Sequence, residues 1–215
     1  MPRRRSKRQR VPDTGRTLGK RSPKKRFILF CEGETEKCYF DALNRFFKDA
    51  LIEVRSEPVG GVPKTVADKA IPAKTARRRG DSFEKNDEVW AVFDRDTHPA
   101  YEESIERCDS AGVGVARSNP CFELWLILHF DWYDQSCSNA DVQRKLKLHI
   151  PEYHPVKNKR VDCSDLMASV EQAENRGEWQ FDAREQERQG ALGPPYTTVW
   201  RLTRAVREAA QKFRG

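Results

Sequence analysis

The sequence predicts an α/β fold in which helices flank a mostly parallel sheet. Two apolar runs, at residues 26–31 and 87–93, have the length and composition of buried strands. Between residues 26 and 134, segments of this kind alternate with segments of helical periodicity, which is typical of parallel strands joined by helices. Strand signals then stop, so residues 135–215 are expected to form a helical C-terminal extension or cap.

The element boundaries follow from hydrophobic periodicity and from turn residues. The expected strands span residues 26–31, 51–55, 87–93 and 113–117. The expected helices span residues 35–48, 64–79, 101–111, 121–130, 142–149, 162–176 and 198–213. Pro72 is expected to disturb the second helix, and Gly112 suits a left-handed cap after the third. Asn119 and Pro120 suit the N-cap and the first position of the fourth helix.

Length and composition indicate a globular protein. The 215 residues are enough for one core with an appended subdomain. No apolar run approaches the ~20 residues that a membrane span needs, so no membrane association is expected. The N-terminal charges are not followed by an apolar stretch, so we expect no secretory signal and a cytoplasmic protein. Six cysteines without a C-x-x-C pair favour buried, reduced thiols over a zinc site.

The net charge of +7 is concentrated at the N-terminus. Residues 1–26 hold twelve Lys or Arg and one acid, a sum of +11, which leaves 28 basic and 32 acidic residues, or −4, for the rest. Residues 1–25 are expected to be a disordered basic tail, since they have almost nothing to bury. A solubilising arm is one interpretation of this tail. The other is phosphate contact without sequence readout, through Arg3, Arg4, Arg5, Lys7 and Arg8.

Carboxylates directly follow two of the expected strands. Glu32 follows residues 26–31, and Asp94 and Asp96 form a D-x-D after residues 87–93. In open α/β folds, ligands bind beyond the carboxyl ends of the strands. If the two strands are neighbours, the three carboxylates converge, and their repulsion calls for a cation between them. Oxygen ligands suit Mg²⁺ or Mn²⁺, so we expect a metal site formed by these three residues.

The residues after Glu32 have an ordinary structural interpretation. Acidic side chains are favoured in the first turn of a helix, which accounts for Glu34 and Glu36. Gly33 permits a tight turn from strand to helix, and Thr35 can cap the helix. The N–H groups at that helix end could also cradle a phosphate. Glu32 fits this interpretation poorly, because it directly ends an apolar strand.

A further acid, Glu123, lies early in an otherwise apolar helix. A carboxylate in such a place must be paired, bind a metal or reach the rim of the core. We interpret Glu123 as an additional acid that binds metal or orients water. His129 lies near the end of the same helix, where a structural role in capping carbonyl groups is the better interpretation.

Three other residues are candidates for phosphate contact. Arg95, between the two aspartates, could bind phosphate or balance charge. His98 could be a base or a phosphate contact, with a solvated loop histidine as the alternative. Lys157 follows a proline-marked turn and could neutralise phosphate, although a surface lysine is equally consistent. We keep all three as candidate nucleic-acid-binding residues.

Three motifs together carry a resemblance to a known family. They are Cys31-Glu32-Gly33-Glu34-Thr35-Glu36, Val92-Phe93-Asp94-Arg95-Asp96 and Ser118-Asn119-Pro120-Cys121-Phe122-Glu123-Leu124-Trp125. The set resembles the RloB family. That family is similar to the Toprim domain of topoisomerases, primases and OLD-type nucleases, where a glutamate after one strand and a D-x-D after another meet at a divalent metal. The resemblance implies a Toprim-like, Rossmann-like domain over residues 26–134.

The resemblance also implies a function. It implies a Mg²⁺- or Mn²⁺-dependent nuclease, acting on DNA or RNA, in a prokaryotic antiphage or abortive-infection system. By position, Asp94 and Asp96 would bind metal, and Glu32 would bind metal or transfer a proton. We add Glu123 to the catalytic residues because of its expected proximity. An ABC- or AAA-type ATPase encoded nearby is the implied partner, and homo-oligomerisation is left open.

Two other classes of function stay open. The chain could be a non-catalytic regulatory or docking subunit of the ATPase, with structural acids only. Nucleotidyl or primase-like transfer would use a similar metal cluster, but no template or nucleotide signature accompanies it here. No Walker P-loop occurs, so ATP hydrolysis by this chain is not expected.

Overall fold

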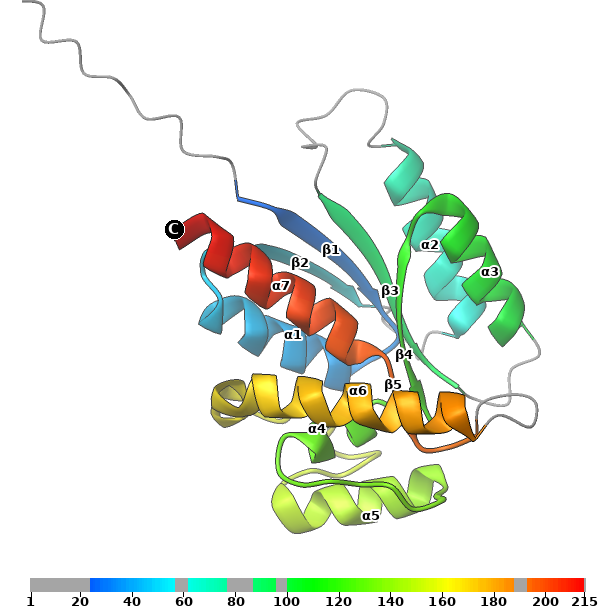
Figure 1. Cartoon of the computed structure of the whole chain (residues 1–215), viewed down its shortest axis with the longest axis vertical. Coiled ribbons are helices and arrows are strands. Elements are labelled where there is room, and N and C mark those ends of the chain that lie inside the picture. Colours follow the sequence, from blue (N-terminus) through cyan, green and yellow to red (C-terminus); the bar gives the residue numbers. More distant parts are fainter. Residues whose placement is uncertain (1–23, 57–61, 77–86, 96–99, 188–192, 215) are drawn as a thin grey trace, which may run out of the picture.

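The computed structural model describes residues 24–56, 62–76, 87–95, 100–187 and 193–214. Its five-stranded sheet has the order β2-β1-β3-β4-β5 (Figure 1). The strands are β1 (Arg26–Cys31), β2 (Leu51–Ser56), β3 (Glu88–Asp94), β4 (Gly114–Asn119) and β5 (Tyr196–Thr197). Strands β1 to β4 run parallel, and β5 pairs antiparallel with β4. The expected α/β class with a mostly parallel sheet is confirmed.

Helices cover both faces of the sheet, as Figure 1 shows. The first face is covered by α1 (Glu34–Phe46) and α7 (Val199–Arg214), and the second by α2 (Pro63–Ala76) and α3 (Tyr101–Ala111). The other helices are α4 (Glu123–Leu128), α5 (Asn139–His149), a 3-10 helix (Ser164–Ser169) and α6 (Val170–Gln186). Helix α6 packs on α7 and α4, and α5 packs on α4. The C-terminal helices therefore pack around the first face.

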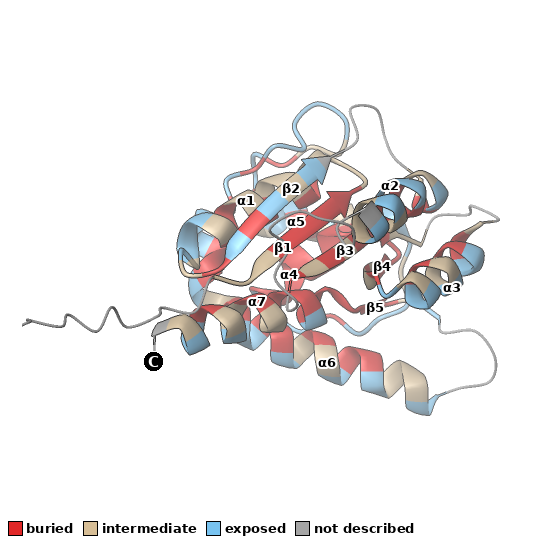
Figure 2. Cartoon of the chain, turned by 90° about the horizontal axis from the view of Figure 1, so that it is seen from above, coloured by how far each residue is buried: buried red, intermediate tan, exposed pale blue. Residues whose placement is uncertain are grey.

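Alternate residues of the central strands enter two different cores. Phe27 and Leu29 of β1 lie in the core beneath α1 and α7, whereas Ile28 and Phe30 lie in the core beneath α2 and α3. Continuous apolar runs are typical of parallel strands that are buried on both faces. Figure 2 shows β1 and β3 as largely buried and the edge strand β2 as partly exposed.

Two boundaries differ from the sequence-based expectation. Asn119 does not cap a helix: it ends β4, and α4 begins only at Glu123. Asn119 instead pairs with Tyr196 of β5. That strand is only two residues long, too short to show a period-two pattern, so no strand was expected over residues 196–197. The helix expected over 162–176 divides into the 3-10 helix and the longer α6.

Several smaller expectations can be compared directly. Pro72 lies inside α2, which continues past it to Ala76. Gly112 adopts the expected left-handed conformation, with a φ of 70°, and its N–H closes the end of α3 on Asp109 O. All six cysteines are free, and four of them are buried. None of the described helices has the length and apolarity that crossing a bilayer requires.

Candidate active site

An acidic hollow of about 150 Å³ lies at the carboxyl ends of β1 and β3. The turn between β1 and α1, the end of β3, the start of α4, helix α5 and the segment after α5 all line it. We call it the acidic pocket. Its carboxylates are those of Glu32, Glu34, Glu36, Asp94 and Glu123. Five carboxylates from three separate segments therefore surround one small hollow.

Glu32 and Asp94 meet because β1 and β3 are neighbours in the sheet. Cys31 pairs with Val92 in the parallel register, and the Glu32 N–H donates to Val92 O at 3.2 Å. The Asp94 N–H donates in turn to Glu32 Oε2 at 3.1 Å. Side chains alternate along a strand, so Asp94 follows Val92 towards the face that α1 covers. The expected convergence is observed for these two acids, and their role as metal ligands stays a prediction.

Glu36 is part of the pocket, although the sequence favoured an ordinary first-turn acid. Its side chain is only 5% exposed. The space for its carboxylate depends on Gly33, since a Cβ atom at that position would lie 3.1 Å from Glu36 Oε2. Gly33 is the N-cap of α1 in an extended conformation, so its small size matters here rather than an unusual φ. Acids common in first turns carry no sequence signal of burial, which is why this one was missed.

Glu123 is held by two hydroxyl groups from distant segments. It is the first residue of α4 and is 5% exposed. Its Oε1 accepts a hydrogen bond from the Tyr153 hydroxyl at 2.7 Å and one from Thr35 Oγ1 at 3.4 Å. Thr35 therefore does not cap α1. Both bonds end on the same oxygen and fix the orientation of the carboxylate.

The cations at the pocket come from the segment after α5. Lys159 is the one cationic side chain among the described residues that line the pocket. Arg160 Nε donates to Glu34 Oε2 at 2.8 Å at the rim. Lys157, the sequence-based candidate, is exposed and does not line the pocket. The residue two positions further along takes the place that we expected of Lys157.

More carboxyl groups line the pocket than its cations would neutralise if all of them were ionised. Burial raises the pKa of Glu36 to about 8, and the charges of Glu123 and Glu32 add to this effect while Lys159 opposes it. Burial also raises the pKa of Asp94, followed by the effects of Glu36, Glu32 and Glu123. The neighbouring carboxyl groups of the pocket therefore share protons, as carboxylates do when no cation lies between them.

The oxygen ligands of the pocket are of the type that a hard divalent cation prefers, but those described are not arranged around a common point. Carboxylate oxygens are the ligands that Mg²⁺ and Mn²⁺ prefer, and a cation would offset the repulsion that raises these pKa values. In the part of the chain that the structure describes, no three His, Cys, Asp or Glu side chains are already arranged to hold an ion. Asp96, the second acid of the D-x-D, lies outside the described residues.

The other expected site residues lie elsewhere. Arg95 stacks on the Tyr101 ring at 5.5 Å and lies 3.9 Å from Glu102, so it does not line the acidic pocket. His98 and residues 1–23 of the basic tail, including Arg3, Arg4, Arg5, Lys7 and Arg8, lie outside the described residues.

His129 has the structural role expected of it, with different partners. Its Nδ1 contacts Leu166 O at 2.9 Å and its Nε2 contacts the Tyr39 hydroxyl at 3.1 Å. These partners belong to other elements rather than to its own helix end. Burial lowers the pKa of His129 to about 3, so the ring is neutral in the fold.

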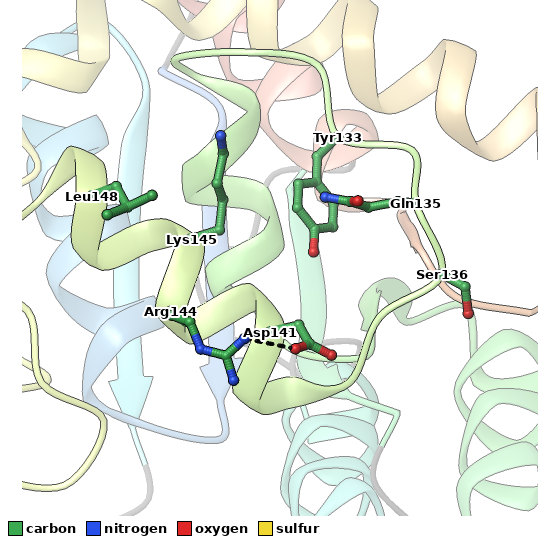
Figure 3. Close-up of a pocket in the computed structure, with 7 residues that line it drawn as sticks. All are labelled: Tyr133, Gln135, Ser136, Asp141, Arg144, Lys145 and Leu148. Carbon is green, nitrogen blue, oxygen red and sulfur yellow. Dashed lines mark hydrogen bonds and ion pairs between the residues drawn. The ribbon is translucent and has the colours of Figure 1, made fainter.

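A second, larger hollow has a different chemical character. It measures about 420 Å³ and lies between α5 and the preceding loop (Figure 3). Arg144 Nη1 pairs with Asp141 Oδ1 there at 3.1 Å, while Leu148 is 74% exposed. Asp141 is the one carboxylate among the described residues that line it, and Lys145 adds a second cation beside Arg144. The acidic pocket is therefore the stronger candidate for chemistry.

Comparisons with known proteins identify a family. Neither the curated proteins nor the solved structures contain a match. The family model described as RloB-like protein matches residues 27–206, which include the sheet, the acidic pocket and most of the C-terminal helices. The chain therefore belongs to the RloB-like family.

Proposed function

We propose that the acidic pocket catalyses metal-dependent hydrolysis of phosphodiester bonds in DNA or RNA. The observation that supports this most is the excess of carboxyl groups over cations at the carboxyl ends of two adjacent parallel strands, where Glu32, Glu36, Asp94 and Glu123 line one hollow with a single lysine. A purely structural group of acids would be expected to have matched cations. An excess of this kind is typical of functional sites.

In this proposal Glu32, Asp94 and Asp96 would hold Mg²⁺ or Mn²⁺, and Glu36, which lines the same pocket as Glu32 and Asp94, would add a carboxylate. When bound, such an ion polarises a phosphate oxygen and makes water more acidic. Burial, followed by the neighbouring carboxylates, raises the pKa of Glu36 and of Asp94, so a bound cation would favour their ionised forms. Ion binding and deprotonation of the pocket are therefore coupled.

The remaining pocket residues have distinct roles. Glu123 accepts a proton from water or orients it, because its carboxylate is fixed by Tyr153 and Thr35. Lys159 faces the same hollow and contacts a phosphate oxygen of the substrate.

We also propose the biological setting that the family resemblance implies. The chain acts in a prokaryotic antiphage or abortive-infection system, with an ABC- or AAA-type ATPase as its partner. If the pure chain lacks activity, the assay is repeated with that ATPase and ATP. A complex that forms but never cleaves would favour the docking-subunit alternative.

The decisive test is the substitution Asp94→Asn. Purified protein is incubated with plasmid, single-stranded DNA and tRNA in the presence of Mg²⁺ or Mn²⁺. We expect the substitution to reduce cleavage at least about 100-fold, because a ligand of the ion is lost. We also expect Mn²⁺ to raise the Tm of the wild type and not that of the variant.

Asp109→Asn is the matched control, since Asp109 is an exposed aspartate on α3, away from the pocket. It should cleave and bind Mn²⁺ as the wild type does. Equal cleavage by wild type and Asp94→Asn on every substrate would refute catalysis by this pocket.

A further inference from the structure

A row of arginine and aromatic side chains lies near the same end of the sheet and runs around its β4–β5 edge, from Arg95 and Tyr101 on the second face to Phe181 of α6 and Arg201 of α7. Arg95 stacks on Tyr101 at 5.5 Å, and the Tyr101 and Tyr196 hydroxyls lie 3.3 Å apart. Arg117 stacks on Tyr196 at 5.6 Å. The row continues from Tyr196 to Phe181, with ring centroids 5.9 Å apart, and from Phe181 to Arg201 at 4.7 Å. We call these six residues the arginine–aromatic row.

The row and the acidic pocket meet at the end of β3. Phe93 packs with Tyr101 in the core beneath α2 and α3, at 5.8 Å between ring centroids. The alternation of the strand sends Asp94 to the pocket, while Arg95 stacks with Tyr101 on the other side. The Arg95 N–H bonds Ser118 O at 2.7 Å, which ties the end of β3 to β4, the strand that carries Arg117. Asp94 thus belongs to the acidic pocket, and the next residue, Arg95, belongs to the arginine–aromatic row.

Two arginines of the row, Arg117 and Arg201, differ from the arginines that pair with acids on α6, whereas Arg95 lies 3.9 Å from Glu102. Arg204, one turn beyond Arg201 on α7, forms two hydrogen bonds of 2.8 Å with Glu178. Among the described residues, by contrast, no carboxylate forms an ion pair with Arg117 or Arg201. Arg117 is half-buried and Arg201 is exposed. Their guanidinium groups are held by rings, which leaves the edge N–H donors open to a ligand.

We propose that the arginine–aromatic row binds the phosphate backbone of a nucleic acid. A planar guanidinium presents two N–H donors in the geometry of phosphate oxygens. Several such groups in line suit a repeated anion rather than a single small one. The inference goes beyond the proposed cleavage, since binding at the row needs neither the ion nor the pocket. It also explains why Arg95 faces away from the acids it follows.

The test uses the full chain in EDTA, so that no cleavage can occur. Binding of fluorescein-labelled single-stranded DNA, duplex DNA and RNA is measured by anisotropy over a range of KCl concentrations. For the double variant Arg117→Gln/Arg201→Gln we expect a Kd at least about tenfold weaker near 0.1 M KCl. We expect the slope of log K against log salt to fall by about 1 for each arginine. The effect should be similar for DNA and RNA, because the phosphate is common to both.

The matched control is Arg107→Gln/Arg144→Gln, which removes the same charge from α3 and α5, where the arginines pair with Asp68 and Asp141. It should weaken binding less than about twofold, because long-range effects are screened at this salt. Equal weakening by both double variants, or none by either, would overturn the proposal.

Circular dichroism and Tm establish that each variant is folded. If the double variant is not, the exposed Arg201→Gln alone is used, with an expected loss of about threefold and a slope change of about 1. An unchanged Kd for that variant would overturn the proposal. Failure of cleavage with normal binding would concern only the acidic pocket.

Discussion

Two buried glutamates in this protein show how differently a carboxylate can be compensated. Glu174, on α6, is fully buried, and its Oε2 accepts two hydrogen bonds from Arg207, at 3.1 and 2.7 Å, with Arg204 at 3.9 Å. Glu36, in the acidic pocket, is almost as buried, yet its neighbours are other carboxylates and one lysine. The carboxylate of Glu174 is therefore compensated by arginines of the same chain, whereas that of Glu36 is not.

The difference separates a structural acid from a candidate catalytic one. Burial raises the pKa of both groups, but at Glu174 the contacts with Arg207 and Arg204 oppose it. At Glu36 the neighbouring carboxylates add to the effect of burial. A buried acid that is paired with arginines holds α6 on α7. A buried acid whose neighbours are other acids is a candidate for binding a cation that is not part of the chain.

The largest expected effect comes from breaking the balanced pair. Glu174→Gln removes the charge that faces Arg207 and Arg204, and we expect it to lower the free energy of unfolding by about 4 kcal/mol, the range seen when one partner of a buried pair is lost. Chemical denaturation followed by circular dichroism measures the change.

Glu178→Gln is the control for that loss. It removes a partner of Arg204 from the same helix, but the Glu178 side chain is 38% exposed. The expected cost is therefore about 0.5 kcal/mol. If both substitutions lower the free energy of unfolding equally, burial of the Glu174 pair does not make it more important for stability than the exposed Glu178 pair.

The second prediction concerns the unbalanced acid and its dependence on pH. In EDTA, the folded protein should keep a proton on Glu36 up to about pH 8, whereas the unfolded chain loses it near the ordinary value of 4.5. At Glu36 the folded state then binds more protons, so this group contributes a slope by which stability falls as pH rises between these values, separate from the contributions of His129 and Asp94. Glu36→Gln should remove this slope and stabilise the protein at pH 7 by on the order of 2 kcal/mol, since neighbouring acids share the protons.

Denaturation curves from pH 4.5 to 8 measure this slope for wild type and variant. The variant should be more stable than the wild type, opposite in sign to Glu174→Gln. A Glu36→Gln protein that is less stable than the wild type at pH 7 would show that Glu36 is compensated after all.

The smallest expected effect concerns the orientation of Glu123. Tyr153→Phe removes the hydroxyl that donates to Glu123 Oε1 at 2.7 Å. We expect a loss of about 1 kcal/mol in stability. If Glu123 acts in cleavage, we also expect a rate about tenfold lower, because its carboxylate is less well oriented.

Tyr133→Phe serves as the control for this rate, because Tyr133 lines the second hollow rather than the acidic pocket. It should leave cleavage unchanged. If Tyr153→Phe cleaves at the rate of the wild type, the hydrogen bond that orients Glu123 does not contribute to cleavage.

Much of the fold could be predicted because its signals are local. The strand at residues 26–31 was expected with the bounds that the structure shows, since a run of apolar residues buried on both faces is distinctive. The end of β4 was not, because Asn119-Pro120 resembles a helix start and the pairing with β5 depends on residues almost eighty positions away. Short edge strands have no periodicity of their own.

The residues of the candidate site also divide into those that local sequence signals identify and those that only the tertiary structure brings together. Glu32 and Asp94 could be identified because each ends an apolar strand. Glu36, Tyr153 and Lys159 could not, because a first-turn acid, a tyrosine after a helix and a loop lysine are ordinary in sequence. What distinguishes them is proximity across separate segments, as in the hydrogen bond between Tyr153 and Glu123.

The order of apolar runs and turns along this chain was enough to determine that strands alternate with helices and that acids stand where two strands end. Only the packed structure decided which buried acids have arginines beside them and which have other acids. Coulomb interaction depends on distance in space and on burial rather than on separation in sequence, so the charge balance of Glu36 and Glu174 arises only when the segments come together.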